Sequence, residues 1–132
     1  SILIQNNTSL ISLTGLDNLR SGSVYINNNV LLTNLTGLKS FYSGSVVITN
    51  NSKLESLSGL DILNSSYQIR IEGNPVLTNI SSLQSLREVG YKIRISNNDS
   101  LINLSGLENF TRWSYYECDS ITYNCSYRSV IL

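Results

Sequence analysis

Few side chains in this sequence have the types and spacing that chemistry requires. Histidine is absent from the 132 residues, which excludes an imidazole general base, a histidine-based catalytic triad and a histidine metal ligand. Two cysteines cannot build a four-ligand zinc site. The nine carboxylates are scattered over different repeat positions, and the pair that flanks Cys118, Glu117 and Asp119, is typical of a solvated surface. The sequence therefore predicts no catalytic residue, no metal, no cofactor and no enzymatic activity.

Charge and hydropathy exclude two further classes. Nine basic and nine acidic side chains cancel to a net charge of zero. A nucleic-acid groove binder needs a concentrated positive field, so no nucleic-acid partner is expected. No apolar run reaches the roughly 18 residues of a membrane-spanning helix, so we expect no direct membrane insertion in this segment. Charged residues make up only 14% of the chain, and asparagine and serine take their place.

The dominant feature is an internal repeat that covers residues 1 to about 111. Isoleucine recurs at intervals of 22, 22, 23 and 24 residues, and each isoleucine opens a segment with the same pattern of polar and apolar positions. The five isoleucines are Ile4, Ile26, Ile48, Ile71 and Ile95. Short repeats with aligned apolar columns indicate a solenoid, because one repeat cannot bury its own apolar side. Chance similarity does not explain five aligned segments.

Each repeat contains a predicted strand followed by spaced leucines. Apolar β-branched residues alternate with polar ones, as in Val24 and Ile26 or Ile69 and Ile71, which is typical of a half-buried strand. Further along, leucines stand three residues apart, and a glycine follows a hydroxyl residue between them in most repeats. That glycine opposes a regular helix and favours a turn. The sequence thus predicts a mostly-β parallel solenoid of about five coils.

An asparagine pair after each strand has two predicted structural roles. Its first member is Asn6, Asn28, Asn50, Gly73 or Asn97, and the exchange of asparagine with glycine indicates a positive φ. Its second member is asparagine in every repeat. These amides are expected to form a ladder that hydrogen-bonds the turn backbone from coil to coil. The predicted ladder consists of Asn7, Asn29, Asn51, Asn74 and Asn98.

The tail beyond the repeats, about residues 112–132, is predicted to be a C-terminal cap. Cys118 and Cys125 lie there with six residues between them, and a short disulfide loop would staple such a cap. Two buried reduced thiols are the alternative. The tail aromatics are expected to form the core of the cap: Trp113, Tyr115, Tyr116, Tyr123 and Tyr127.

Sequons for N-glycosylation are frequent, and their repeat positions separate them. Ladder residues Asn7 and Asn98 are expected to be too buried to carry a glycan. Three acceptors share one column in which other repeats have Ser12 and Ser56, and this exchange indicates exposure. The candidate acceptors are Asn34, Asn79 and Asn103 in that column, with Asn64 and Asn109 elsewhere. Paired cysteines and sequons together predict an extracellular or cell-surface location.

The outward face of the predicted sheet is the candidate binding surface. One of its columns runs from aromatic and apolar to basic side chains, and tyrosine and arginine are enriched at the centres of interfaces. This candidate binding face consists of Tyr25, Val47, Arg70 and Arg94. The alternative is a plain solvated sheet face with ion pairs such as Glu72–Arg94.

The turn spacing separates this repeat from common leucine-rich repeats. After the ladder asparagine the next core residue follows at Asn-x-x-Leu, as in Asn98-Asp99-Ser100-Leu101, where leucine-rich repeats have Asn-x-Leu. The combined pattern resembles the receptor L-domain family of insulin-receptor and EGF-receptor ectodomains, which also occurs in fungal and other microbial surface proteins. The resemblance implies a right-handed single-stranded parallel β-helix that works in extracellular binding or adhesion.

Three functions remain open at this point. The first is a non-enzymatic extracellular module that recognises a protein or glycan partner at the cell surface. The second is a structural subunit of an extracellular filament or cell-wall layer, in which adjacent copies or domains of the same protein meet end to end. The third is a leucine-rich-repeat interaction scaffold, which the turn spacing, sequons and cysteines disfavour. The absence of polar end caps also predicts that residues 1–132 belong to a longer chain.

Overall fold

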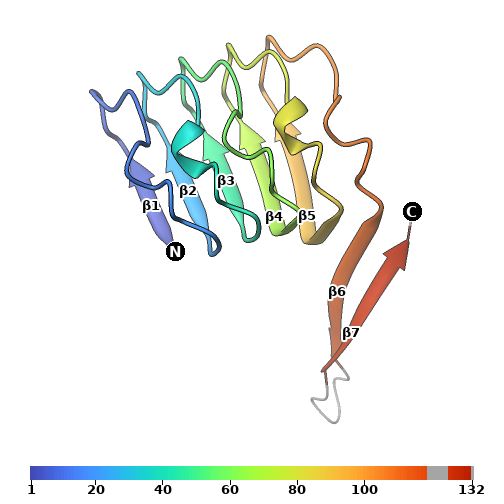
Figure 1. The fold of residues 1–132 in the computed structure, drawn as a ribbon. Helices are drawn as coiled ribbons and strands as arrows, with labels where there is room; N and C mark the ends of the chain where they lie inside the picture. Colours follow the sequence, from blue (N-terminus) through green and yellow to red (C-terminus); the bar gives the residue numbers. More distant parts are fainter. Residues whose placement is uncertain (119–124, 132) are drawn as a thin grey trace.

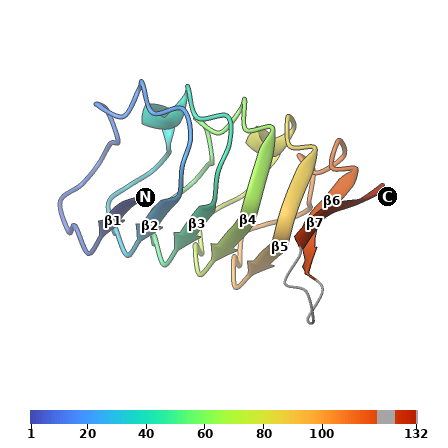
Figure 2. The same ribbon diagram turned by 90° about the horizontal axis from the view of Figure 1, so that it is seen from below.

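The chain folds into a parallel β-solenoid of about five coils, each with one main strand (Figures 1 and 2). The computed structural model describes the backbone of residues 1–118 and 125–131 and the side chains of residues 1–114, 130 and 131. The described strands and short 3-10 helices are β1 (Ile2–Gln5), β2 (Val24–Asn27), η1 (Thr36–Leu38), β3 (Val46–Thr49), β4 (Ser65–Glu72), η2 (Ser81–Leu83), β5 (Glu88–Ser96), β6 (Arg112–Cys118) and β7 (Cys125–Ile131). The mostly-β solenoid predicted from the repeat is confirmed.

Strand register follows the sequence repeat residue by residue. Strands β1 to β5 pair in parallel and in chain order. Ile4 pairs with Ile26, Ile26 with Ile48, Ile48 with Ile71, and Ile71 with Ile95. Because successive side chains of a strand point to opposite faces, this register places every repeat isoleucine inside the solenoid. The gapless alignment of the five segments is therefore also their alignment in space.

The turn after each strand has the backbone that the first asparagine column predicted. Asn6, Asn28, Asn50 and Asn97 have φ between 54° and 60°, and Gly73 has φ 65°. Asparagine and glycine are the residues that adopt this left-handed conformation at least cost. The prediction of a positive φ at this column is confirmed.

Leucine columns close the interior opposite the sheet. In the three middle coils they are completely buried, as at Leu57, Leu60 and Leu63, and Phe41 occupies the last column of the second coil. The chain between them consists of turns and of η1 and η2. Ser82, the one exception to the glycine pattern, lies in η2, so its backbone does not need the positive φ that Gly59 and Gly106 adopt.

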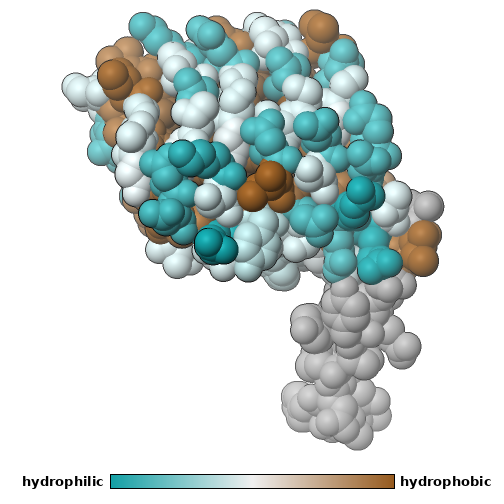
Figure 3. All heavy atoms as spheres, in the orientation of Figure 1, coloured by the Kyte–Doolittle hydropathy of each residue, from teal (hydrophilic) through white to brown (hydrophobic). Residues whose placement is uncertain are grey.

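The two outer coils are only partly closed. Ile4, Leu10 and Leu16 in the first coil are half-buried, and so are Ile95 and Leu107 in the fifth. Each lacks the neighbouring coil that covers its counterpart in the middle of the stack. Figure 3 shows hydrophobic side chains gathered at the end formed by the first coil, whereas most of the visible surface is polar.

The C-terminal segment, predicted to be a cap, leaves the coils as a hairpin. Strand β6 pairs with β5 only through Arg112 and Trp113, and then forms an antiparallel hairpin with β7 that extends away from the coils (Figure 1). Trp113 does pack on the last coil, with its ring edge-on to Phe110 at 5.0 Å. The predicted disulfide between Cys118 and Cys125 and the predicted core contacts of Tyr115, Tyr116, Tyr123 and Tyr127 lie outside the described side chains.

Candidate functional site

The second asparagine column forms a continuous hydrogen-bonded chain along the solenoid. The backbone N–H of Asn29 donates to Oδ1 of Asn51 at 3.0 Å, and the backbone N–H of Asn51 donates to Oδ1 of Asn74 at 3.0 Å. Asn7 joins the chain by donating to Asn29, and Asn98 joins it by accepting from Asn74. These bonds use the side chains to hold the turns, which leaves them unsuited to a ligand.

Burial of the ladder is complete in the middle and incomplete at the ends. Asn29, Asn51 and Asn74 are 0% exposed. Asn7 is exposed and Asn98 is half-buried, so the expectation that both are too buried for a glycan is wrong for Asn7. The physical reason is that Asn7 lies in the first coil, which no described coil covers. Among the described side chains, no buried nitrogen or oxygen lacks a hydrogen-bond partner.

The predicted binding column lies on the outer face of the sheet, and its members differ in exposure. Arg70 and Arg94 are exposed and stand directly opposite each other on β4 and β5. Tyr25 is half-buried. Val47 is only 6% exposed, so it lies beneath its neighbours and offers a partner little surface. The structure therefore concentrates the accessible part of this column at its two arginines.

One carboxylate holds the two arginines together. Nε of Arg70 donates to one carboxylate oxygen of Glu72, and Nε of Arg94 donates to the other. The Ser96 hydroxyl also donates to Glu72, at 2.8 Å. Two like charges directly opposite on neighbouring strands repel each other, and the shared carboxylate offsets that repulsion. The Glu72–Arg94 ion pair, which the sequence suggested as part of the alternative of a plain solvated face, is present, and Arg70 extends it to a three-residue cluster.

Glu72 is charged and well enclosed in this cluster. Its side chain lies on the outer face of the sheet between Arg70 and Arg94, and the residue is only 7% exposed. The hydrogen bond from Ser96, together with the charges of Arg70 and Arg94, holds the pKa of the Glu72 carboxyl below its ordinary value, although burial acts in the opposite direction. The carboxylate therefore stays ionised at neutral pH and fixes both guanidinium groups in place.

Two stacked tyrosines stand beside this cluster, and they arise from the lengthening of the repeat. Ser43 pairs with Ser65 and Val46 with Ile69. One residue more therefore lies between Ser65 and Ile69 than between their partners in the coil before. The register between β4 and β5 shifts between Ser66 and Gln68, where Tyr67 stands opposite two residues of β5, Gly90 and Tyr91. The rings of Tyr67 and Tyr91 stack at 5.6 Å with planes 11° apart, and both are about 60% exposed.

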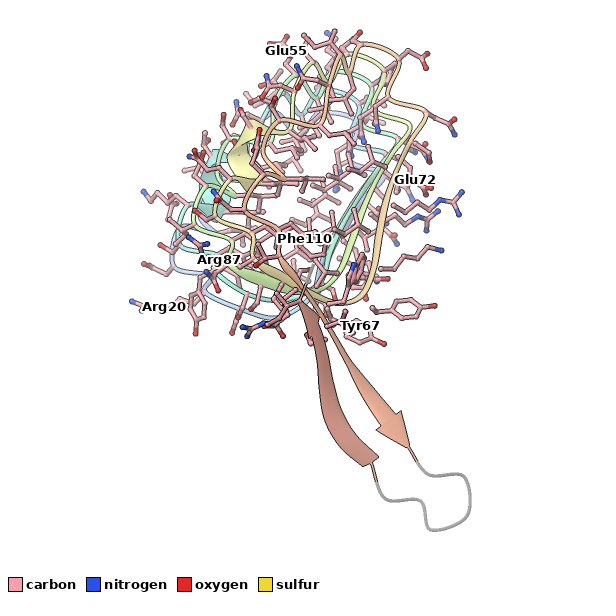
Figure 4. The ribbon with its side chains drawn as sticks, turned by 90° about the vertical axis from the view of Figure 1, so that its right-hand side faces the viewer. Arg20, Glu55, Tyr67, Glu72, Arg87 and Phe110 are labelled. Atoms are coloured by element: carbon pink, nitrogen blue, oxygen red, sulfur yellow. The ribbon has the colours of Figure 1, made fainter. Side chains whose placement is uncertain are left out.

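Arg70, Arg94 and Tyr91 contribute to the lining of a hollow of about 260 Å³ on this face. Its lining comes from Gln68, Ile69, Arg70, Tyr91, Lys92 and Arg94. In Figure 4, Glu72 and Tyr67 lie on the same side of the solenoid, whereas Arg20 and Arg87 lie on the opposite side. Tyr67 and Tyr91 are not among the residues predicted from the sequence to form this site. The growth of the repeat from 22 to 23 and 24 residues is the signal that could have located them.

Three carboxylates have a structural role that the sequence analysis overlooked. Asp17, Asp61 and Glu108 share one repeat position, and each accepts the backbone N–H of the glycine two residues earlier. The N–H of Gly15 and a bond from Lys39 lower the pKa of Asp17, and backbone N–H donors lower that of Glu108. The carboxylates are therefore less scattered than the sequence analysis stated, because these three stabilise turns.

The sequon column has a comparable turn geometry. Oδ1 of Asn34 accepts from the backbone and hydroxyl of Thr36, and Asn79 does the same with Ser81. Asn103 accepts from the backbone of Ser105 and is exposed, as are Asn64 and Asn109, whereas Asn34 and Asn79 are half-buried. The exposure predicted for this column therefore holds at Asn103 and is only partial at Asn34 and Asn79, whose Oδ1 atoms bond the chain two residues further on.

The fold and this surface define the class of the protein as a parallel β-solenoid with a charged and aromatic patch on its sheet. Comparison of the chain with protein-family models, curated proteins and solved structures found no match. The resemblance to the receptor L-domain family thus stays a prediction. Within the described residues, no helix combines the length and hydropathy that crossing a bilayer requires, and no three metal-ligating side chains form a group.

Proposed function

We propose that this chain is a non-enzymatic extracellular module of the receptor L-domain kind that binds a protein or glycan at the cell surface. The observation that carries the proposal is the Arg70–Glu72–Arg94 cluster on the outer face of the sheet. Strands β4 and β5 present the two guanidinium groups to solvent, next to two exposed tyrosines. Arginine and tyrosine on a preorganised surface are the residues that most often dominate binding energy.

The proposed extracellular location rests on the sequons and on the two cysteines, and the positions of both in the fold are compatible with it. The candidate glycan acceptors Asn64, Asn103 and Asn109 are exposed. Cys118 and Cys125 are opposite each other in the β6–β7 hairpin. Paired residues of antiparallel strands have Cα atoms about 4.5–5.5 Å apart, a separation that a disulfide spans without strain. We therefore keep the disulfide as part of the proposal, together with an oxidising compartment.

Binding through this face can be tested on arrays of cell-surface glycans and ectodomains. The wild-type chain is compared with the double variant Arg70→Glu, Arg94→Glu and with the matched control Arg20→Glu, Arg87→Glu, whose arginines lie on the opposite side (Figure 4). The face variant is expected to lose the ligands that the wild type retains, and the control to keep them. Equal binding by the three proteins would reject this face.

A second candidate function is a structural subunit of an extracellular filament or wall layer. The end of the first coil is open and apolar, with a hollow of about 530 Å³ lined by side chains that include Ile2, Ile4, Leu10 and Leu16. In the middle coils, Oδ1 of each ladder asparagine accepts the backbone N–H of the ladder asparagine in the coil before. Oδ1 of Asn7 would accept in the same way from a coil added at this end. Concentration-dependent polymers on sizing, abolished by Leu10→Asp, would support stacking of copies. A concentration-independent monomer would exclude it.

A further inference from the structure

The way in which Glu72 holds the two arginines leaves most of their donors available. A guanidinium group has five N–H donors, and the contact with Glu72 uses the Nε donor of each arginine. About four donors on each of Arg70 and Arg94 therefore remain. Because the two residues are register partners, these donors stand side by side above the sheet.

The local charge of the patch is positive. Arg70, Lys92 and Arg94 contribute three positive charges and Glu72 contributes one negative charge, which gives a net charge of about +2. Gln68 and Ser96, the other outward residues here, are neutral. A carboxylate or sulfate ester presents two oxygens that match a guanidinium fork, and this bidentate geometry is the strongest that arginine forms with an anion.

The tyrosine pair adds an apolar surface of a particular shape. Tyr91 lines the same hollow as both arginines, and its ring is stacked on that of Tyr67. The C–H-rich face of a pyranose ring is flat and apolar, so it can cover an exposed aromatic ring while its hydroxyls stay in water. An acidic sugar combines this face with an anionic group on one rigid ring, which limits the entropy lost on binding.

We propose that the hollow between Tyr91 and the Arg70–Glu72–Arg94 cluster binds an acidic saccharide, whose carboxylate or sulfate lies on the two guanidinium groups and whose sugar ring packs on the tyrosines. This inference rests on the proposed function of the sheet face and names its ligand class. The lining of the hollow, with two arginines, Lys92 and an exposed tyrosine, favours an acidic saccharide, because such a ligand carries its anionic group and its flat C–H face on one rigid ring.

Calorimetry with three oligosaccharides tests the ligand class. The probes are hexagalacturonate, which carries carboxylates, a chondroitin sulfate hexasaccharide, which also carries sulfate esters, and neutral galactohexaose. At least one anionic probe is expected to bind, and galactohexaose is not. The affinity is expected to fall as salt rises from about 50 to about 200 mM, because screening weakens exposed charge pairs. Equal affinity for the neutral probe would overturn the proposal.

Variants separate the two parts of the site. Arg70→Gln with Arg94→Gln is expected to weaken binding about tenfold or more, whereas the matched pair Arg20→Gln with Arg87→Gln stays within about twofold. Tyr91→Leu is expected to weaken oligosaccharide binding and to leave binding of inorganic sulfate unchanged. Circular dichroism spectra like that of the wild type establish that each variant is folded. Undiminished affinity in the glutamine variant would overturn the cluster's role, and wild-type affinity in Tyr91→Leu would overturn the stacking.

The failure of this inference differs from the failure of the proposed function. If all three oligosaccharides fail to bind while the array ligands are lost from the Arg70→Glu, Arg94→Glu variant, the face binds a partner of another class and the saccharide proposal falls alone. If the array ligands are also unaffected by that variant, the proposed function of the face falls with it.

Discussion

Asn51 donates two hydrogen bonds to one atom of Asn74. Its backbone N–H and its side-chain Nδ2 both reach Oδ1 of Asn74, at 3.0 and 3.2 Å. The same Nδ2 also donates to the carbonyl of Ile26, at 3.0 Å. Each middle asparagine thus bonds the asparagine of the next coil and a strand carbonyl of the coil before. These bonds satisfy the polar groups of buried turns that have no regular secondary structure.

Replacing Asn51 with alanine is expected to lower the free energy of unfolding by about 1–3 kcal/mol, because the N–H of Asn29 would be buried without its acceptor and the carbonyl of Ile26 would lose one donor. Urea denaturation followed by circular dichroism measures the change. Asn7→Ala is the matched control and is expected to cost less, since Asn7 is exposed. Equal stability of Asn51→Ala and the wild type would contradict the ladder.

The first asparagine column is expected to tolerate glycine and to reject β-branched residues. Asn50 has φ 57°, a conformation that costs a β-branched side chain about 1–2 kcal/mol. Asn50→Val should therefore unfold at lower urea concentration than the wild type, whereas Asn50→Gly should stay close to it. The idea fails if valine and glycine at this position give the same midpoint.

Acid is expected to loosen the Arg70–Glu72–Arg94 cluster. The folded-state pKa of Glu72 lies below its ordinary value of 4.5, so the ionised form contributes stability above that value and loses it as the pH falls through the folded pKa. Urea midpoints measured between about pH 6 and pH 3 should converge for the wild type and Glu72→Gln. The difference between the two proteins isolates Glu72 from Asp17 and Glu108, whose pKa values are also lowered. A constant difference would show that Glu72 has no such role.

The paired cysteines are expected to be oxidised in protein from a secretory host. Intact mass measured before and after reduction and alkylation should reveal one disulfide between Cys118 and Cys125, which are register partners in the hairpin. Because the hairpin extends away from the coils (Figure 1), reduction should speed hydrogen exchange in β6 and β7 and leave β2 to β4 unchanged. Two free thiols in the secreted protein would contradict the proposed compartment.

Most of the solenoid is predictable from the sequence, because every repeat must meet the same packing and backbone requirements. Ile26 and Ile48 must face inward in the same register, and Asn28 and Asn50 must supply the same left-handed turn. A periodic chain therefore reveals its register without knowledge of long-range contacts. The expectation of full burial fails where the stack ends, at Asn7, because end effects depend on which coils are present.

The features that the sequence did not predict arise where the chain departs from the repeat. The segment 66–68 has one residue more than the coil before it, and β5 has one more where Gly90 and Tyr91 stand opposite Tyr67; alignment outward from the isoleucines does not show where the side chains of such insertions point. The sharing of Glu72 between two arginines requires three side-chain conformations that no spacing rule fixes. The direction of the chain after Trp113 is also non-local, because it follows from pairing with β7 and not from the coil pattern.

The most direct test of the binding site observes the arginines themselves. In protein with isotope-labelled arginine, the Nε–H signals of Arg70 and Arg94 are followed by NMR during titration with the anionic hexasaccharide that calorimetry finds to bind more tightly. Both signals are expected to shift saturably, with the dissociation constant found by calorimetry, while those of Arg20 and Arg87 stay in place. Uniform shifts at all four arginines, or none at Arg70 and Arg94, would contradict a site built on Glu72.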